Sequence, residues 1–223
     1  HKTVRRQRQM CIRDRFMAAG FCMLEAGQVR SKNTAVICLK NIGLFSIAGL
    51  MYYLVGYNLM YDGVDGGYIG SFSMFDRSSE VDLETGYAAA SDWYFQMVFV
   101  ATTASIVSGA LAERILIWPF FLFTAILTAF IYPIAGSWQW GGGWLSEMGF
   151  SDFAGSTLVH SVGGYAALAG AILLGARDGK YSADGKVNVI GGCSLPMTTL
   201  GVFILWLGSV SYTHLRAHET SGY

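Results

Sequence analysis

His160 is the first candidate for chemistry because it is the one histidine that lies far from both ends of the chain. It sits in the uncharged stretch Gly155–Gly175, which is rich in glycine, alanine and other small residues. An ionisable group in a membrane is costly and usually faces a bundle interior or an aqueous path. Because an imidazole has an unperturbed pKa of about 6.5, it can exchange a proton near neutral pH. The alternative is a histidine that joins two helices through a hydrogen bond to a backbone carbonyl.

A second group of candidates combines aromatic rings with one carboxylate. Phe95 and Phe99 are four residues apart and share a helix face, whereas Trp140 precedes three glycines and offers an indole face that can attract a cation. Asp152 stands where the helix containing His160 should begin, about 12 Å before the histidine, so its carboxylate can cap the helix and favour a cation nearby. The alternatives are core or lipid-facing phenylalanines, an interfacial tryptophan anchor and a purely structural cap.

The elements that must position these residues are membrane helices. Hydrophobic residues make up 53% of the 223 residues and charged residues 13%, against roughly a quarter charged in soluble domains. Uncharged runs of about 20 residues are typical of bilayer spans, and several in one chain argue against a soluble protein with fully buried helices. We therefore predict an all-α, polytopic transmembrane helix bundle. Its predicted apolar segments are residues 16–28, 35–61, 93–112, 115–136, 155–176 and 195–208.

Loop charges and small residues predict how these segments are arranged. The loops after the first, third and fifth segments carry six Lys and Arg residues, whereas loop 62–92 has one basic residue, Arg77, against seven acids. The positive-inside rule therefore places the basic loops in the cytoplasm. Only Glu113–Arg114 separates the third and fourth segments, which predicts a tight helical hairpin. Small residues spaced by four predict close helix packing, and they are Gly163, Ala167, Ala171 and Gly175.

The two ends differ from the rest of the chain. Residues 1–15 are strongly basic, and residues 209–223 also lack the membrane pattern. Both resemble translated adapter sequence from DNA sequencing, so we expect them to be foreign and take residues 16–208 as the domain. The cysteines show no disulfide or metal-ligand spacing, and we expect no metal and no cofactor. No nucleotide-binding loop or basic nucleic-acid patch occurs in residues 16–208, so we expect no nucleic-acid partner.

Four motifs carry a family resemblance: "EAGQVRSKN", "FQMVFVATTASIVSGALAER", "WQWGGGW" and "DFAGSTLVHSVGGYAALAGA". In this order they resemble the ammonium transporter family (Amt/MEP/Rh), and its Amt branch in particular. The resemblance covers nearly all of residues 16–208. It implies eleven spans with an external N-terminus, a homotrimer with one pore per subunit, and a multi-pass protein of the bacterial inner (plasma) membrane.

The resemblance also implies a role for each candidate residue. Trp140 matches the tryptophan of the external ammonium recruitment site, which Phe99 lines and Asp152 supports. Phe99 also gates the pore, and Phe95 matches the ring stacked beneath it. His160 matches the first of two histidines in a narrow hydrophobic pore, where ammonium loses its proton before ammonia passes.

The chain departs from the family pattern at its end. The sixth segment stops at "LGVFILWLG", so the family's second half, with the second pore histidine, has no counterpart here. Because the two halves of the family are inverted repeats with the path at their interface, we expect a truncated first repeat that is inactive alone.

The expected function is ammonium uptake across the membrane, without enzymatic activity or catalytic residues. The main alternative is an ammonium-sensing membrane domain coupled to a signalling output, which would share every motif. The resemblance also suggests a cytoplasmic nitrogen-regulatory signalling protein as a partner. A haem-binding membrane subunit with His160 as axial ligand is disfavoured, because the interior of the chain offers no second ligand candidate. A different secondary transporter would lack the ordered set of motifs.

Overall fold

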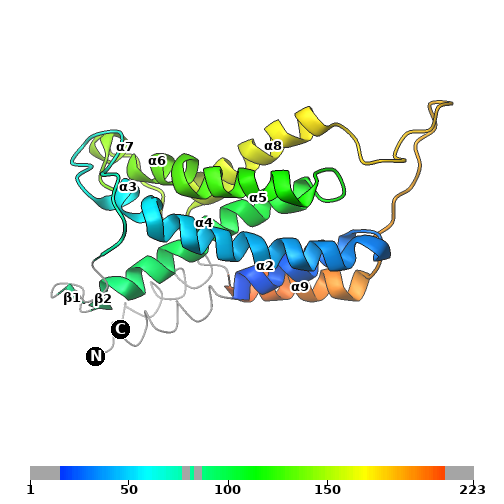
Figure 1. Cartoon of the computed structure of the whole chain (residues 1–223), viewed down its shortest axis with the longest axis horizontal. Helices are drawn as coiled ribbons and strands as arrows, with labels where there is room; N and C mark the ends of the chain where they lie inside the picture. The colour runs from blue at the N-terminus through cyan, green and yellow to red at the C-terminus, as the bar shows by residue number, and fades with distance from the viewer. Residues whose placement is uncertain (1–15, 77–80, 83–86, 209–223) are drawn as a thin grey trace, which may run out of the picture.

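A computed structural model describes residues 16–76, 81–82 and 87–208. Residues 16–28 form the first helix, and a second helical stretch combines a 3₁₀ turn (η1, Ser31–Asn33), α2 (Thr34–Met51), a π-helical turn (η2, Tyr52–Gly56) and α3 (Tyr57–Tyr61). The middle of the chain forms α4 (Ala89–Ala110), α5 (Ile117–Ile126), a π-helical turn (η3, Leu127–Ile131), α6 (Tyr132–Ser137) and α7 (Trp144–Glu147). A last π-helical turn (η4, Ser156–Ser161) leads into α8 (Val162–Leu174), and α9 (Leu195–Gly208) completes the described part. The long helices lie along the length of the molecule (Figure 1).

The predicted all-α bundle is confirmed. Helices occupy all six apolar segments that the sequence predicts, and the short strands β1 (Val81–Asp82) and β2 (Tyr87–Ala88) form one antiparallel pair in the acidic loop. Among the described residues, three helices are long and apolar enough to cross a membrane: Ser31–Tyr61, Ile117–Ser137 and Ser156–Leu174. The helix α4 has 22 residues but carries several polar side chains, which it buries inside the bundle.

The helix α4 is the centre of the bundle and contacts both α2 and α8. Its buried hydroxyls donate to their own helix: Thr102 to the Val98 carbonyl at 2.8 Å and Thr103 to the Phe99 carbonyl at 3.0 Å. Such bonds remove the cost of polar groups in an apolar interior. Gly163 allows α8 to come close, because a Cβ there would lie 3.0 Å from the Thr103 carbonyl oxygen. The predicted small-residue contact therefore joins α8 to α4.

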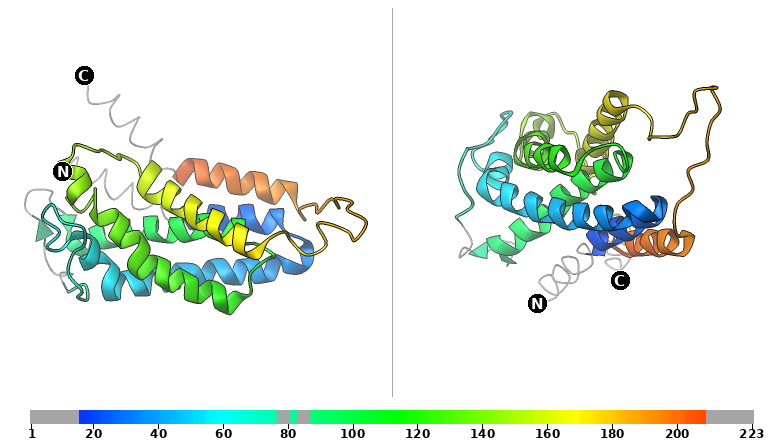
Figure 2. Two further views of the ribbon diagram at one scale, coloured as in Figure 1. Left: turned by 90° about the horizontal axis from the view of Figure 1, so that it is seen from above. Right: turned by 45° about the vertical axis from the view of Figure 1, so that its right-hand side comes forward.

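The helix α9 packs against the first helix rather than against α8 (Figure 2). Gly20 and Gly27 of the first helix face Leu205 and Thr198 of α9, with no room for a Cβ on either glycine. Small residues at both positions let the two backbones approach closely. The long segment between α8 and α9 extends away from the bundle at one end (Figure 1).

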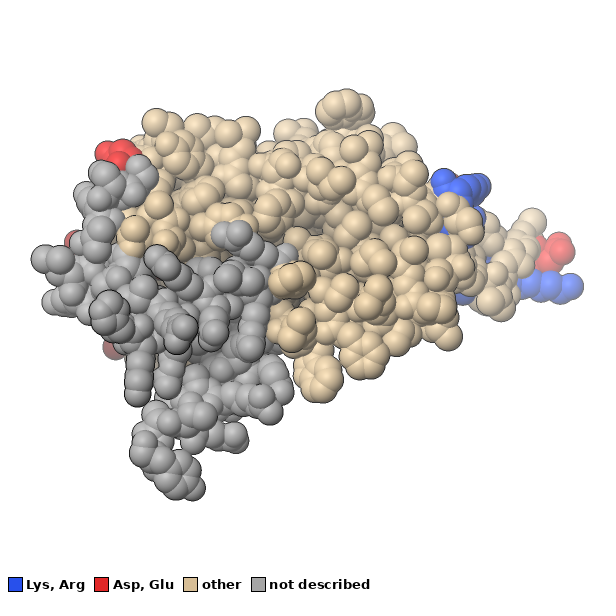
Figure 3. All heavy atoms as spheres, turned by 90° about the horizontal axis from the view of Figure 1, so that it is seen from below, with Lys and Arg blue, Asp and Glu red and all other residues tan. Residues whose placement is uncertain are grey.

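The outer surface fits a membrane protein. Large apolar side chains point outward along the helices, such as Ile42, Trp118 and Leu173, which are 67%, 77% and 86% exposed. On the face that Figure 3 shows, Lys and Arg atoms gather at one end, and uncharged atoms cover the body of the bundle. Together with the helix lengths, this surface makes the chain an integral, multi-pass membrane protein.

The predicted chain reversal between α4 and α5 is present, but α5 packs mainly against α2 rather than against α4. The chain reverses around Glu113, which adopts a left-handed conformation with φ of 61°. Pro119 stands in the first turn of α5, where its missing N–H costs no helical hydrogen bond. The predicted foreign ends, residues 1–15 and 209–223, and the lone basic residue Arg77 lie outside the described residues.

Candidate functional site

The aromatic candidates form a continuous stack at the end of the bundle opposite the basic loops. The rings of Phe95 and Phe99 meet edge to face, with centroids 5.0 Å apart. Phe99 also contacts the Trp140 indole at 5.6 Å, with an angle of 64° between the ring planes. Phe99 is 5% exposed, so it is the buried middle ring that joins α4 to the loop before α7. The two phenylalanines therefore lie on the same face of α4, as their spacing predicts, and their rings are in contact.

Glycines hold Trp140 in place. Gly141 has no room for a Cβ, because that atom would collide with the Met60 carbonyl oxygen, and Gly142 has a positive φ of 79°. Gly155 also has a positive φ, of 80°, and an added Cβ would lie 3.2 Å from the Trp140 ring. The glycine-rich loop is thus needed for the close approach of the tryptophan to the start of the next helix.

Asp152 binds the start of the helix that carries His160. Oδ1 accepts hydrogen bonds from the N–H groups of Gly155 and Ser156 at 2.9 and 3.0 Å, and Oδ2 accepts from Thr157 and Leu158, both at 2.8 Å. As predicted, the Asp152 side chain accepts hydrogen bonds from the first free N–H groups of the helix. However, Gly155 occupies the cap position, and Asp152 lies three residues before it. The backbone carbonyl of Asp152 accepts the Trp140 indole N–H at 2.7 Å, which links the cap to the aromatic stack.

These bonds also set the charge of Asp152. Its side chain is 4% exposed, and this burial raises the pKa of the carboxyl. The backbone N–H bonds from Leu158, Thr157, Gly155 and Ser156 lower the pKa more strongly, so the net pKa lies below its ordinary value. Asp152 is therefore a carboxylate at neutral pH. Both of its oxygens accept backbone hydrogen bonds, so the carboxylate is held in place by the start of this helix.

His160 lies near the end of the π-helical turn Ser156–Ser161, and its side chain is exposed. Its backbone N–H donates to the Gly155 carbonyl at 2.9 Å. The preceding residue, Val159, is 1% exposed and belongs to the same apolar cluster as Phe99. Within the described part of the chain, no hydrogen bond to the His160 ring is present, so the interhelical bond of the alternative interpretation has no partner there.

A buried polar cluster near the basic end was not predicted from the sequence. Glu25 Oε2 accepts from Ser108 Oγ at 2.7 Å and from Asn41 Nδ2 at 3.2 Å, and it lies 3.8 Å from Lys40 Nζ. Glu25 and Lys40 are 3% and 4% exposed. The available signal was one acidic and one basic residue inside two neighbouring apolar segments, which have to pair if both are buried.

Comparison with known proteins decides the family. Residues 15–213 match the Ammonium Transporter Family. The chain belongs to this family. It is 42% identical over 217 residues to the ammonium transporter Amt2 of Archaeoglobus fulgidus, an alignment that covers 92% of this chain and 46% of that protein. It is 39% identical over 200 residues to ammonium transporter 3 of Dictyostelium discoideum, with 89% and 45% covered.

Solved structures of the ammonium transporter family have the same fold. A structure described as a Sensor Amt Protein matches with a TM-score of 0.85 and 39% identity over 92% of this chain and 52% of that chain. Mep2 of Candida albicans matches with a TM-score of 0.78 and 26% identity over 92% of this chain and 46% of that chain. The chain thus spans about half the length of the relatives it matches.

Proposed function

We propose that the chain is the first half of an ammonium transporter, and that it carries the recruitment site and one side of the pore. The observation that carries this proposal is the contact chain Phe95–Phe99–Trp140, which the Trp140–Asp152 hydrogen bond ties to the helix of His160. An indole face attracts a small monovalent cation by about 0.5–2 kcal/mol, enough for recruitment without tight retention. The nearby Asp152 carboxylate adds a negative charge that favours the same cation.

The proposed path continues from Trp140 past Phe99 and Phe95 to His160. Ammonium transfers one proton to a water molecule on this path, ammonia passes His160, and the imidazole serves as a polar station in the apolar surroundings. The exposed ring of His160 supports this role, because a pore residue at the interface of two repeats needs an open side toward the second repeat. On this proposal the chain does not conduct alone, it does no enzymatic chemistry, and the complete protein assembles as a trimer.

The second candidate function is ammonium sensing. It is favoured by one observation, the match to a Sensor Amt Protein at a TM-score of 0.85. Both functions would use the same recruitment site, whereas a sensor would pass the binding event to a signalling output. Transport by the complete protein in purified vesicles would support the transporter, and ammonium binding without any transport would support the sensor. A cytoplasmic nitrogen-regulatory protein as partner is part of either version.

The recruitment site is tested by Trp140→Leu in a full-length transporter that contains this chain as its first half, here called the completed gene. We expect the half-saturating ammonium concentration to rise by up to about thirtyfold, because the cation–π attraction is lost. The measurement is uptake, with growth on limiting ammonium in an uptake-deficient host as a second readout. The matched control is Trp138→Leu, since Trp138 lies in the same loop but bonds the Tyr68 carbonyl and takes no part in the stack. Equal effects of the two variants would contradict the site.

A further inference from the structure

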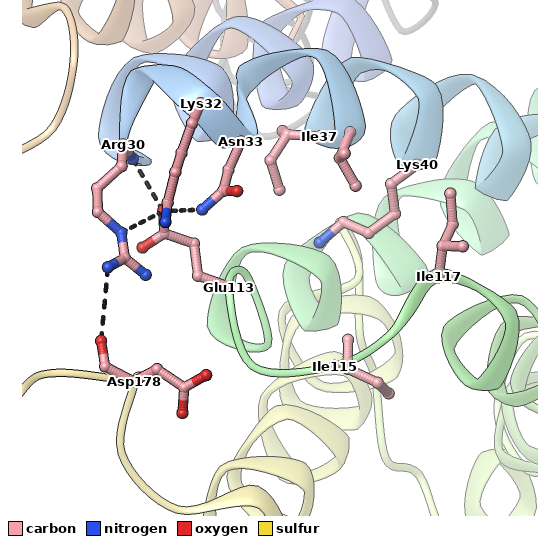
Figure 4. Close-up of a pocket in the computed structure, with 10 residues that line it drawn as sticks. Arg30, Lys32, Asn33, Ile37, Lys40, Glu113, Ile115, Ile117 and Asp178 are labelled. Carbon is pink, nitrogen blue, oxygen red and sulfur yellow. Dashed lines mark hydrogen bonds and ion pairs between the residues drawn. The ribbon is translucent and has the colours of Figure 1, made fainter.

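A pocket of about 290 Å³ lies at the basic end of the molecule, and none of Phe95, Phe99 and Trp140 lines it. It is bounded by the start of α2 and by the turn between α4 and α5. Arg30, Lys32 and Lys40 line it from the α2 side, and Glu113 enters from the turn (Figure 4). Three cationic side chains around one small pocket are an arrangement that the proposed transport path does not use.

Glu113 offsets the charge of Arg30 only in part, because its carboxylate also pairs with Arg177, which does not line the pocket. Its side chain is 1% exposed, and Oε1 accepts from the Arg30 backbone N–H at 2.9 Å, Arg30 Nε at 3.1 Å and Asn33 Nδ2 at 2.6 Å. Oε2 lies 3.5 Å from the Arg177 guanidinium. Burial raises the pKa of Glu113, but the hydrogen bonds from Asn33 and Arg30 together lower it by more. The net pKa lies below its ordinary value, so the carboxylate stays charged. These contacts also fix the wall of the pocket.

Lys40 lines the inner wall of the pocket, and its positive charge is balanced by Glu25 on the side away from the pocket. Its Nζ donates to the Ser108 carbonyl at 2.8 Å and lies 3.8 Å from Glu25 Oε2. Lys32 differs, because its side chain is exposed and forms no salt bridge with any carboxylate in the described ranges. The charged residues that line the pocket are three cations, Arg30, Lys32 and Lys40, and two carboxylates, Glu113 and Asp178, which leaves an excess of one positive charge.

The surroundings of the pocket are apolar and exposed. Its remaining walls include Val36 and Ile117, and Val36 is 51% exposed. The flanking Leu116 and Trp118 are each 77% exposed, and tryptophan is enriched where a membrane helix meets the headgroup layer. The pocket therefore lies at headgroup level, in the leaflet that the loop charges assign to the cytoplasm.

We propose that this pocket binds the headgroup of an anionic phospholipid, with its single negative phosphodiester beside Lys32 and Arg30. Basic pockets between membrane helices on the cytoplasmic side suit such headgroups. A net excess of one positive charge matches a singly charged phosphodiester better than a doubly charged free phosphate. The apolar rim formed by Val36 and Leu116 gives the acyl chains a surface that a soluble phosphate would not use.

The test is lipid binding by the 223-residue chain in detergent, measured by native mass spectrometry with added phosphatidylglycerol or phosphatidylcholine. We expect phosphatidylglycerol to bind more tightly, and Lys32→Ala to weaken its binding about fivefold, the loss of one lysine contact. Lys32→Arg should retain most of the affinity. The matched control is Lys186→Ala, which removes the same charge from the loop between α8 and α9, outside the pocket.

Each outcome decides the proposal independently of transport. Unchanged phosphatidylglycerol binding in Lys32→Ala would overturn it, and so would an equal loss in Lys186→Ala, which would indicate general surface charge. Equal affinity for phosphatidylcholine would overturn the preference for an anionic headgroup. Competition by soluble glycerol phosphate at matched concentration would assign the pocket to a free phosphate ester and contradict the lipid assignment. Because Lys32 is exposed and has no salt bridge among the described residues, its removal should leave the fold intact, and thermal unfolding checks this.

Discussion

Two buried carboxylates stabilise the two ends of this bundle by different means. At the aromatic end, Asp152 binds four backbone N–H groups that follow it by three to six residues. At the basic end, Glu113 binds side chains and a backbone group from loops 64 to 83 residues away. The first organises a single turn locally, whereas the second ties three loops together. A helix cap can therefore be predicted from neighbouring residues, whereas contacts that join distant loops cannot.

The largest expected effect is that of Asp152→Ala. Four backbone N–H groups would lose a charged acceptor, and water has little access to replace it at the two buried ones, those of Gly155 and Leu158. We expect the variant to lose about 3–5 kcal/mol of stability, measured by thermal or denaturant unfolding in detergent. Asp178→Ala, which removes an exposed carboxylate, is the control. A loss below about 1 kcal/mol would contradict the role of Asp152 as the organiser of this turn.

Glu113→Gln should have a smaller effect. The amide keeps one acceptor for Asn33 and Arg30 but removes the charge, and the side chains of Arg30 and Arg177 are 33% and 23% exposed, so both can regain water. We expect a loss of about 1–3 kcal/mol in the same unfolding measurement, with Glu147→Gln, at an exposed position, as the control. A loss equal to that of Asp152→Ala would show that both ends rely on equally inaccessible partners.

Acid should weaken both ends through the same two groups. Because the folded-state pKa values of Asp152 and Glu113 are lowered, their stabilisation is fully present above the unfolded values of about 3.9 and 4.3 and is lost as the pH falls through the folded values. The melting temperature should therefore be flat with respect to these groups from pH 5 to 7 and fall below about pH 4. Asp152→Asn should reduce that fall, and an unchanged acid profile in this variant would exclude Asp152 as a source.

The sequence predicted the parts of the fold that depend on local pattern. Apolar run lengths located the helices, and Glu113–Arg114 between two runs predicted the chain reversal, although not that α5 would pack against α2. The cap by Asp152 was predictable because donor and acceptor lie within one turn, although the positive φ of Gly155 shifted the cap position away from Asp152. The contact of Trp140 with Phe99 came only from the family resemblance, since the loop that brings them together has no periodic pattern.

Other features could not be predicted from one sequence. The burial of Glu25 beside Lys40 depends on how three helices pack, and hydropathy shows the two charges but not their pairing. The clasp at Glu113 needs the positions of Arg30, Asn33 and Arg177, which lie in loops far apart in the chain. Each of these contacts follows from the assembled bundle rather than from a local rule.

The most direct test of the proposed path is His160→Ala in the completed gene, followed by current recordings on supported membranes with ammonium and potassium. If His160 is the polar station of the pore, the variant should lose ammonium conduction or conduct other cations through a wider and less selective path. Its stability should change little, because the ring forms no hydrogen bond in the described residues. An unchanged rate of ammonium conduction with unchanged ion selectivity would contradict the proposed path and would leave His160 with a structural role only.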